Sequence, residues 1–119
     1  MSDDLSEVVI EGGDVVVARV SGEIDLSNAV HVGEQLAAAV ANTALGLVID
    51  LTATDYLDSS GVHLVFDLAD RLRQRQQQLR IVVPEGAPMR RVLRIVELGG
   101  TVPVLADVDA AVSEIRAVA

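Results

Sequence analysis

Hydrophobic residues recur along this chain with two different spacings. Short runs rich in β-branched residues cover residues 5–11, 15–20, 47–50, 79–83 and 102–105, a length and composition typical of β-strands. Between these runs, apolar residues return every three or four positions, which is the period of one face of an α-helix. The pattern predicts a single α/β domain over all 119 residues, with the element order β-β-α-β-α-β-α-β-α. We expect a mixed sheet of four to five strands and about four helices.

Turn and capping residues mark the ends of the first elements. A Gly-Gly-Asp turn at residues 12–14 can reverse the chain between two antiparallel strands. Asp25 or Ser27 can cap a first helix that reaches about residue 41. Its expected apolar face consists of Ala29, Val32, Leu36, Ala39 and Val40. A second helix is expected from near Ser60 to about Gln77.

The last third of the chain has its own boundary signals. Pro88 suits the first turn of a third helix, and the glycine pair at residues 99–100 suits its end. Pro103 has no backbone N–H to donate to the hydrogen bonds between strands, so the strand over residues 102–105 should lie at a sheet edge. Asp107 or Asp109 can then cap a terminal helix.

The run over residues 47–50 is apolar without alternation, as in a parallel strand that is buried on both faces. Asp50 marks its carboxyl end, and the polar turn Asp58-Ser59-Ser60-Gly61 follows before the second helix. In open α/β sheets, ligands and partners gather at the carboxyl ends of the strands. This turn is therefore the first candidate for a functional site.

Charge narrows the range of partners. The chain has 18 acidic and 9 basic residues and a net charge of −9, which repels phosphate backbones and anionic lipid surfaces. We therefore expect neither nucleic acid nor a membrane as a direct partner. No segment approaches the roughly 18 uninterrupted apolar residues of a membrane span, and the amino terminus lacks the features of a secretion signal. A cytoplasmic location is expected.

The residue types that the chain lacks exclude several kinds of catalytic and binding site. All nine basic residues are arginine, so no lysine is available for a nucleotide-binding loop, a Schiff base or a receiver domain. The chain also has no cysteine for a disulfide, a thiolate nucleophile or a metal site. We expect a protein that is not an enzyme and that needs no cofactor.

The serine turn has two compatible interpretations. Its two hydroxyls lie at the start of a helix, where free N–H groups and the helix dipole favour a negative charge such as a phosphate. The simpler interpretation is that Asp58 or Ser59 is the N-cap and that Gly61 allows close backbone packing. A serine near a cap can also accept a phosphoryl group.

The second helix carries a polar stripe formed by Ser59, His63, Asp67 and then Asp70 or Arg71. Its apolar side consists of Val62, Val65, Phe66, Ala69 and Leu72. The stripe is either a solvated face or a surface for a partner. A nucleophile and base formed by Ser59 and His63 is a third interpretation, which the absence of a G-x-S-x-G motif disfavours.

Two further clusters have a specific and a simple interpretation. Four aspartates at expected strand ends could bind a divalent cation, or could serve only as caps and for solubility, which we favour, with no metal bound. These are Asp25, Asp50, Asp55 and Asp58. Arg90, Arg91 and Arg94 could meet an acidic partner or offset nearby carboxylates, and the acidic net charge favours the latter.

Several segments together resemble the STAS domain, and more narrowly the stand-alone bacterial anti-sigma-factor antagonists. They are Gly22-Glu23-Ile24-Asp25, Val48-Ile49-Asp50-Leu51, the Asp58-Ser59-Ser60-Gly61 turn and the segment over residues 92–99. The resemblance covers nearly the whole chain, and the serine turn between a strand and a helix is its most specific part.

The resemblance implies a switch in transcription regulation, such as a stress response. The unphosphorylated protein would bind an anti-sigma factor that is also a serine kinase and so release the sigma factor, and phosphorylation of Ser59 would end that binding. Ser60 is the second choice of acceptor, and a phosphoserine phosphatase is a further expected partner. The implied partner-binding residues are Asp25, Asp58, Ser60, Gly61, His63 and Asp67. The alternative is a STAS scaffold or sensing module that is never phosphorylated and works in a larger signalling assembly.

Overall fold

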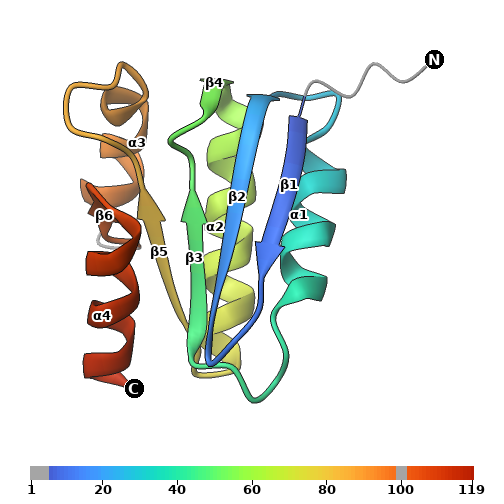
Figure 1. The fold of residues 1–119 in the computed structure, drawn as a ribbon. Coiled ribbons are helices and arrows are strands. Elements are labelled where there is room, and N and C mark those ends of the chain that lie inside the picture. Colours follow the sequence, from blue (N-terminus) through green and yellow to red (C-terminus); the bar gives the residue numbers. More distant parts are fainter. Residues whose placement is uncertain (1–5, 99–101) are drawn as a thin grey trace.

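The computed structural model describes residues 6–98 and 102–119, and these form one mixed sheet with helices on both faces (Figure 1). The strands are β1 (Ser6–Glu11), β2 (Val15–Ile24), β3 (Gly46–Asp50), β4 (Thr54–Leu57), β5 (Gln78–Val82) and β6 (Val104–Leu105). Their order in the sheet is β1-β2-β3-β5-β6, and β4 pairs with the far end of β2. Only the β1–β2 pair is antiparallel within this part of the chain. The predicted α/β class and mixed sheet are confirmed.

Four helices pack on this sheet within the described residues: α1 (Ala29–Ala39), α2 (Ser59–Gln74), α3 (Met89–Leu98) and α4 (Val108–Val118). α4 lies on one face, and α1 and α2 lie side by side on the other (Figure 1). The sheet divides the core accordingly, because successive residues of a strand point to opposite faces. Leu47 and Ile49 pack in the larger cluster with α1 and α2, whereas Val48 packs with Ala111 and Ile115 of α4. All five residues of β3 are buried, as predicted for a strand covered on both faces.

The strand β4 was not predicted. Its four residues, TDYL, are buried only at the two ends, so they lack the alternation that signals a strand. β4 pairs with β2 beyond a register irregularity between Gly22 and Glu23, and Gly22 has a φ of 87°, in the left-handed region that glycine adopts most readily. The strand exists because β2 continues past the end of β3 and offers a free edge there.

The predicted boundaries of α1 and α2 differ from those observed. Asn28 is the N-cap of α1, because the Asp25 carboxylate instead accepts hydrogen bonds from the backbone N–H and the hydroxyl of Ser27. α2 ends at Gln74, three residues before the predicted end, and Gln76 then has a φ of 61°. The predicted cap Asp107 is observed, with its carboxylate accepting from the N–H of Ala110.

Three further predictions concern strand β6, the end of α3 and membrane-spanning helices. β6 lies at the sheet edge, as predicted from Pro103, but covers only two residues. The glycines expected to end α3, at residues 99–100, lie outside the described residues. None of the helices in the described part of the chain is both long and apolar enough to cross a membrane.

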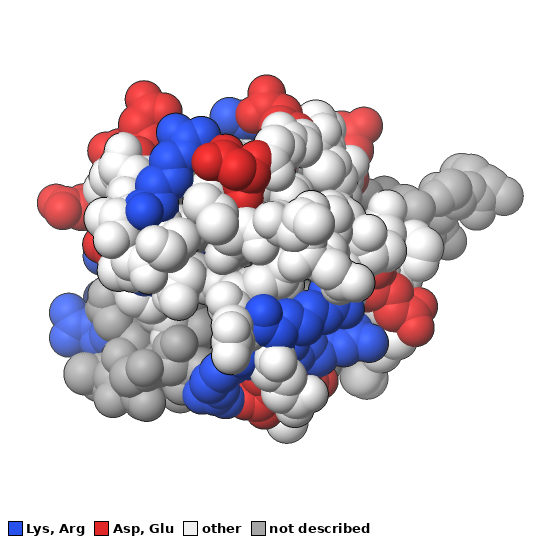
Figure 2. Space-filling model, turned by 90° about the horizontal axis from the view of Figure 1, so that it is seen from below, with Lys and Arg blue, Asp and Glu red and all other residues white. Residues whose placement is uncertain are grey.

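The end of the molecule seen in Figure 2 lies opposite the Asp58 turn, where the parallel strands begin. Charged side chains surround an uncharged centre in this view (Figure 2). Among the described residues, Arg73 pairs with Asp70 within α2, and Arg116 of α4 pairs with Asp14 of the β1–β2 turn at 2.9 Å. The predicted functional residues lie at the other end of the sheet or along α2.

Candidate functional site

The site begins where β2 and β4 end side by side. Ile24 of β2 pairs with Leu57 of β4, so Asp25 and Asp58 are the next residues on two adjacent parallel strands. The backbone N–H of Asp58 donates a hydrogen bond of 3.2 Å to the carbonyl of Ile24. The turns that carry Asp25 and Asp58, two of the predicted partner-binding residues, are therefore joined at one end of the sheet.

Asp58 is the N-cap of α2. Its backbone is extended, with φ −97° and ψ −169°, and its Oδ1 accepts hydrogen bonds from the N–H groups of Ser60 at 2.8 Å and Gly61 at 3.3 Å. These donors belong to the first turn, where helical N–H groups lack partners within the helix. The cap predicted as Asp58 or Ser59 is Asp58. Ser59 is exposed, and no group in the described part of the chain hydrogen-bonds to its hydroxyl.

Gly61 fixes how closely α2 approaches the sheet. An added Cβ would stand 2.6 Å from Cγ of Leu57, 2.7 Å from its Cδ1 and 3.3 Å from Cγ2 of Ile24. Contacts under 3 Å require atoms to move, and here the neighbours are buried side chains in a close-packed core. Gly61 is itself buried, so it sets the position of the serines from beneath the site.

Ser59 and Ser60 face different depressions on the two sides of α2. Ser59 lines a hollow of about 410 Å³, which we call the α2–α3 hollow. The other residues that line it are Leu57, Asp58, Val62, His63, Phe66 and Val92. Val62 and Phe66 are half-buried here, so part of the predicted apolar side of α2 is open to solvent beside Ser59.

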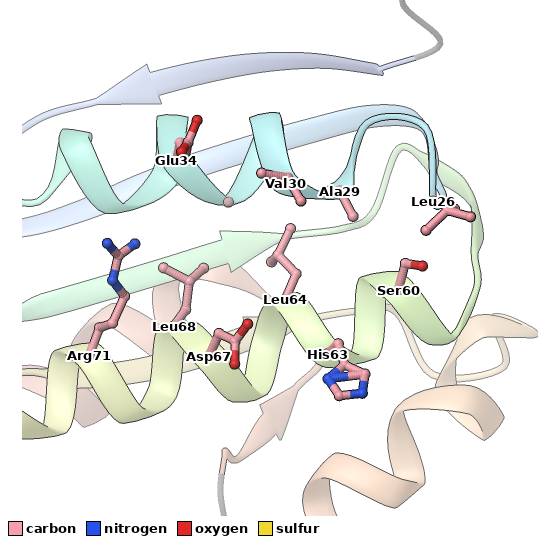
Figure 3. Close-up of a pocket in the computed structure, with 11 residues that line it drawn as sticks. Leu26, Ala29, Val30, Glu34, Ser60, His63, Leu64, Asp67, Leu68 and Arg71 are labelled. Carbon is pink, nitrogen blue, oxygen red and sulfur yellow. The ribbon is translucent and has the colours of Figure 1, made fainter.

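Ser60 lines a second depression of about 460 Å³ between α1 and α2, the α1–α2 groove (Figure 3). From α2 its lining includes Ser60, His63, Leu64, Asp67, Leu68 and Arg71. From α1 and the turn before it come Leu26, Ala29, Val30, Gly33 and Glu34. His63 lines both depressions, so this residue of the predicted polar stripe lies between them.

The six predicted partner-binding residues lie in different places in the structure: in the α2–α3 hollow, in the α1–α2 groove or outside both. Asp58 and His63 line the α2–α3 hollow, and Ser60, His63 and Asp67 line the α1–α2 groove. Asp25 lies at the same end of the sheet but lines neither depression, and Gly61 is buried. The residues of this prediction therefore surround the first two turns of α2, except Asp67, which lies further along the helix.

The considered cation site is absent from the described residues, where no three carboxylate, histidine or cysteine side chains converge. Three of the four aspartates, Asp25, Asp50 and Asp58, instead accept local hydrogen bonds. Asp50 accepts from the N–H of Thr52 at 3.0 Å and from its hydroxyl at 2.5 Å, and Arg19 lies 3.6 Å from the same carboxylate. Asp25 and Asp58 hold the turns that follow β2 and β4.

Ser59 and His63 do not form a catalytic pair in this geometry. They are four residues apart on α2, and no hydrogen bond joins them within the described part of the chain. A serine nucleophile needs a base within hydrogen-bond reach to remove its proton. The geometry therefore does not support Ser59 as a nucleophile activated by His63.

The arginine cluster near the start of α3 lines a third hollow, of about 470 Å³. Arg90 is held by a hydrogen bond of 3.3 Å from its Nε to the carbonyl of Val83. Arg91 and Arg94 form no ion pair with the described carboxylates. The cluster therefore offsets no described carboxylate through a direct ion pair.

The residues on the α1 side of the groove were not predicted from the sequence as functional residues. Leu26 and Val30 are 82% and 75% exposed, although both are large apolar residues. The available signal was that Val30 falls outside the predicted apolar face of α1, where the polar side of the helix should lie. Its meaning depends on the position of α2, which the pattern of one helix does not give.

The sequence-family model of the STAS domain matches residues 7–111 of this chain. The anti-sigma-F factor antagonist RsfB of Mycobacterium tuberculosis is 28% identical over 114 residues, covering 96% of this chain and 92% of RsfB.

Solved structures agree in fold. A crystal structure of an anti-sigma factor antagonist from Mycobacterium paratuberculosis superposes with a TM-score of 0.81 at 30% identity, covering 97% of both chains. The Bacillus cell fate determinant SpoIIAA in its phosphorylated form superposes with a TM-score of 0.68 at 22% identity, covering 92% of this chain and all of the other.

Proposed function

The chain belongs to the STAS domain family, and we propose that it is an anti-sigma-factor antagonist whose binding is switched off by phosphorylation of Ser59. RsfB and the paratuberculosis protein match almost the whole chain, and both are named as antagonists of an anti-sigma factor, which for RsfB is the anti-sigma-F factor. The proposed partner is an anti-sigma factor with serine kinase activity, which is bound by the unphosphorylated protein.

The observation that carries the proposal is the division of labour between Asp58 and Ser59. Asp58 satisfies the N–H groups of Ser60 and Gly61, so the fold does not use the Ser59 hydroxyl as a cap. Ser59 is exposed at the amino terminus of a 16-residue helix, where the dipole favours an added negative charge. A kinase can therefore reach this hydroxyl, and the fold should tolerate the phosphate.

The position of Ser59 also explains how a phosphate would act on binding. The serine borders the apolar α2–α3 hollow, where Val62, Phe66 and Val92 offer a surface that a partner can cover. A phosphoserine carries about two negative charges, which would lie beside Asp58 in the same contact. Charge and bulk would then expel a docked partner while the domain stays folded.

The proposal assigns the chemistry of phosphoryl transfer to the partner. The chain has no lysine, so it lacks the lysine of the common nucleotide-binding loops, and ATP and Mg²⁺ are taken to arrive with the kinase. A phosphoserine phosphatase would restore the binding form. We place this cycle in the cytoplasm, where sigma factors act.

The test is a binding titration with the purified anti-sigma factor of the source organism. Wild type should bind, and Ser59→Asp should bind at least tenfold more weakly. Ser113→Asp is the matched control, because Ser113 is an exposed serine on α4, on the other face of the sheet. Equal binding by wild type and Ser59→Asp would overturn the switch and favour a scaffold role that needs no phosphorylation.

A further inference from the structure

The α1–α2 groove is a long trough. Its α2 side runs from Ser60 to Arg71, which is about three helical turns or roughly 16 Å at 1.5 Å per residue. Along this length its floor is apolar, formed by Ala29 of α1 and by Leu64 and Leu68 of α2 (Figure 3). This shape suits the apolar stripe of a helix laid along the groove.

The rim of the groove holds apolar side chains that the fold leaves in water. Leu26 and Val30 are the two most exposed large hydrophobic residues of the described chain, at 82% and 75%. Single exposed apolar residues are common on protein surfaces, but two beside an apolar floor form a continuous patch. Covering both would bury apolar surface that contributes nothing to folding.

Gly33 keeps the groove open from the α1 side. A glycine inside a helix costs about 0.5–1 kcal/mol relative to alanine. An added Cβ would meet only Cγ and Cδ1 of Leu64, at 3.4 and 3.5 Å, which is ordinary contact. The domain therefore has room for a side chain at position 33, and the glycine leaves the space above the buried Leu64 unfilled.

The charges of the groove define what can occupy it. Glu34 on α1 and Asp67 on α2 place a carboxylate on each wall, and Arg71 lies at the far end (Figure 3). With a net charge of −9 behind them, these walls disfavour an anionic lipid and attract cationic groups. A helix with an apolar stripe flanked by arginine or lysine complements both the floor and the walls.

We infer that the α1–α2 groove receives an amphipathic helix of the anti-sigma factor, with apolar anchors at helical spacing and basic residues on both sides of them. This inference rests on the proposed function and adds a second contact to it. His63 lines both the groove and the α2–α3 hollow, so one partner can cover both surfaces. The groove contact supplies affinity, and the Ser59 contact supplies control.

Isothermal titration of the purified anti-sigma factor into groove variants tests the inference. Val30→Glu places a charge on the apolar rim, and Gly33→Met fills the trough over Leu64. Val118→Glu is the control, because Val118 is a 55% exposed valine on α4. We expect both groove variants to bind at least tenfold more weakly and the control to bind within twofold of wild type, with thermal unfolding showing that each variant is folded.

The outcomes separate the groove from the switch. If both groove variants bind within twofold of wild type while Ser59→Asp does not bind, the groove inference is wrong and the proposed function stands. If wild type does not bind the anti-sigma factor, the proposed function fails and the groove inference fails with it. Hydrogen exchange on the complex identifies the occupant: a protected basic amphipathic helix in the partner supports the inference, and protection confined to acidic or non-helical segments contradicts it.

Discussion

Gly61 lies so close to Leu57 that a Cβ at position 61 would stand 2.6 Å from Cγ of the leucine. Leu57 is the last residue of β4 and pairs with Ile24 of β2, so this contact seats the first turn of α2 on two strand ends. The exposed serine is therefore held on a rigid base. A modification of Ser59 should change what binds there more than it changes the fold.

Replacing Gly61 with alanine tests this packing. We expect Gly61→Ala to lower the free energy of unfolding by about 1–3 kcal/mol, because the methyl group must displace buried side chains. The control is Gly33→Ala, the other helical glycine of the described chain, where an added Cβ meets Leu64 at ordinary distances. That change should stabilise the protein by about 0.5–1 kcal/mol. Urea unfolding of both variants measures these changes in the free energy of unfolding. Equal stability of wild type and Gly61→Ala would refute the close contact.

The capping role assigned to Asp58 predicts a graded series. Asp58→Ala should cost about 1 kcal/mol of stability, because two N–H groups of the first turn lose their acceptor. Asp58→Asn should retain most of the stability, since its amide oxygen can accept the same bonds. Ser59→Ala should leave stability nearly unchanged. A loss in Ser59→Ala as large as that in Asp58→Ala would show that Ser59 is the cap.

Asp14 and Arg116 connect the β1–β2 turn to the last helix. The hydrogen bonds from the Arg116 side chain, followed by its charge, hold the pKa of the Asp14 carboxyl below its usual range. A lowered pKa in the folded state means that this pair stabilises the fold above the usual carboxyl pKa and ceases to do so as pH falls through the lowered value. Both side chains are exposed, so the effect on stability should be small.

The measurement for this pair is an NMR titration of Asp14. In Arg116→Ala the pKa of Asp14 should rise toward its usual value, and the stability difference from wild type should disappear in strong acid. An unchanged pKa in the variant would mean that the two side chains do not interact in solution.

Arg80 is a buried cation on the α4 face of β5. Its Nε lies 2.5 Å from Oε1 of Glu114 on α4, and its guanidinium also donates to the carbonyl of Leu79 at 2.9 Å. Glu114→Ala should cost about 1–3 kcal/mol, because a largely buried charge loses its acceptor. Arg80→Met should cost less, since it removes the charge and retains an apolar side chain. Urea unfolding compares them, and a larger loss in Arg80→Met would contradict this ranking.

Much of the fold could be predicted because periodicity and caps act locally. The buried strand β3, the capping aspartates 58 and 107 and the edge position of β6 all follow from residues near them in sequence. The strand β4 could not be predicted, since its partner is an edge of β2 that is free only because β3 is short. Pairing between distant segments overrode a weak local signal.

The site was predicted only in part for the same reason. The serine turn is a contiguous motif in the sequence, so Ser59 could be predicted from it. That Ser59 and Ser60 face separate depressions depends on where α1 and α3 pack against α2, which no motif contains. Leu26, Val30 and Gly33 become informative only when the second wall of the groove is known.

The most direct test of the central claim is the position of the phosphate. Wild type, Ser59→Ala and Ser60→Ala should each be incubated with the purified anti-sigma kinase, ATP and Mg²⁺, then analysed by intact-mass and peptide mass spectrometry. We predict a single phosphate on Ser59 in wild type and in Ser60→Ala, and none in Ser59→Ala. Modification of Ser59→Ala to the same extent as wild type would contradict the assignment of Ser59 as the switch.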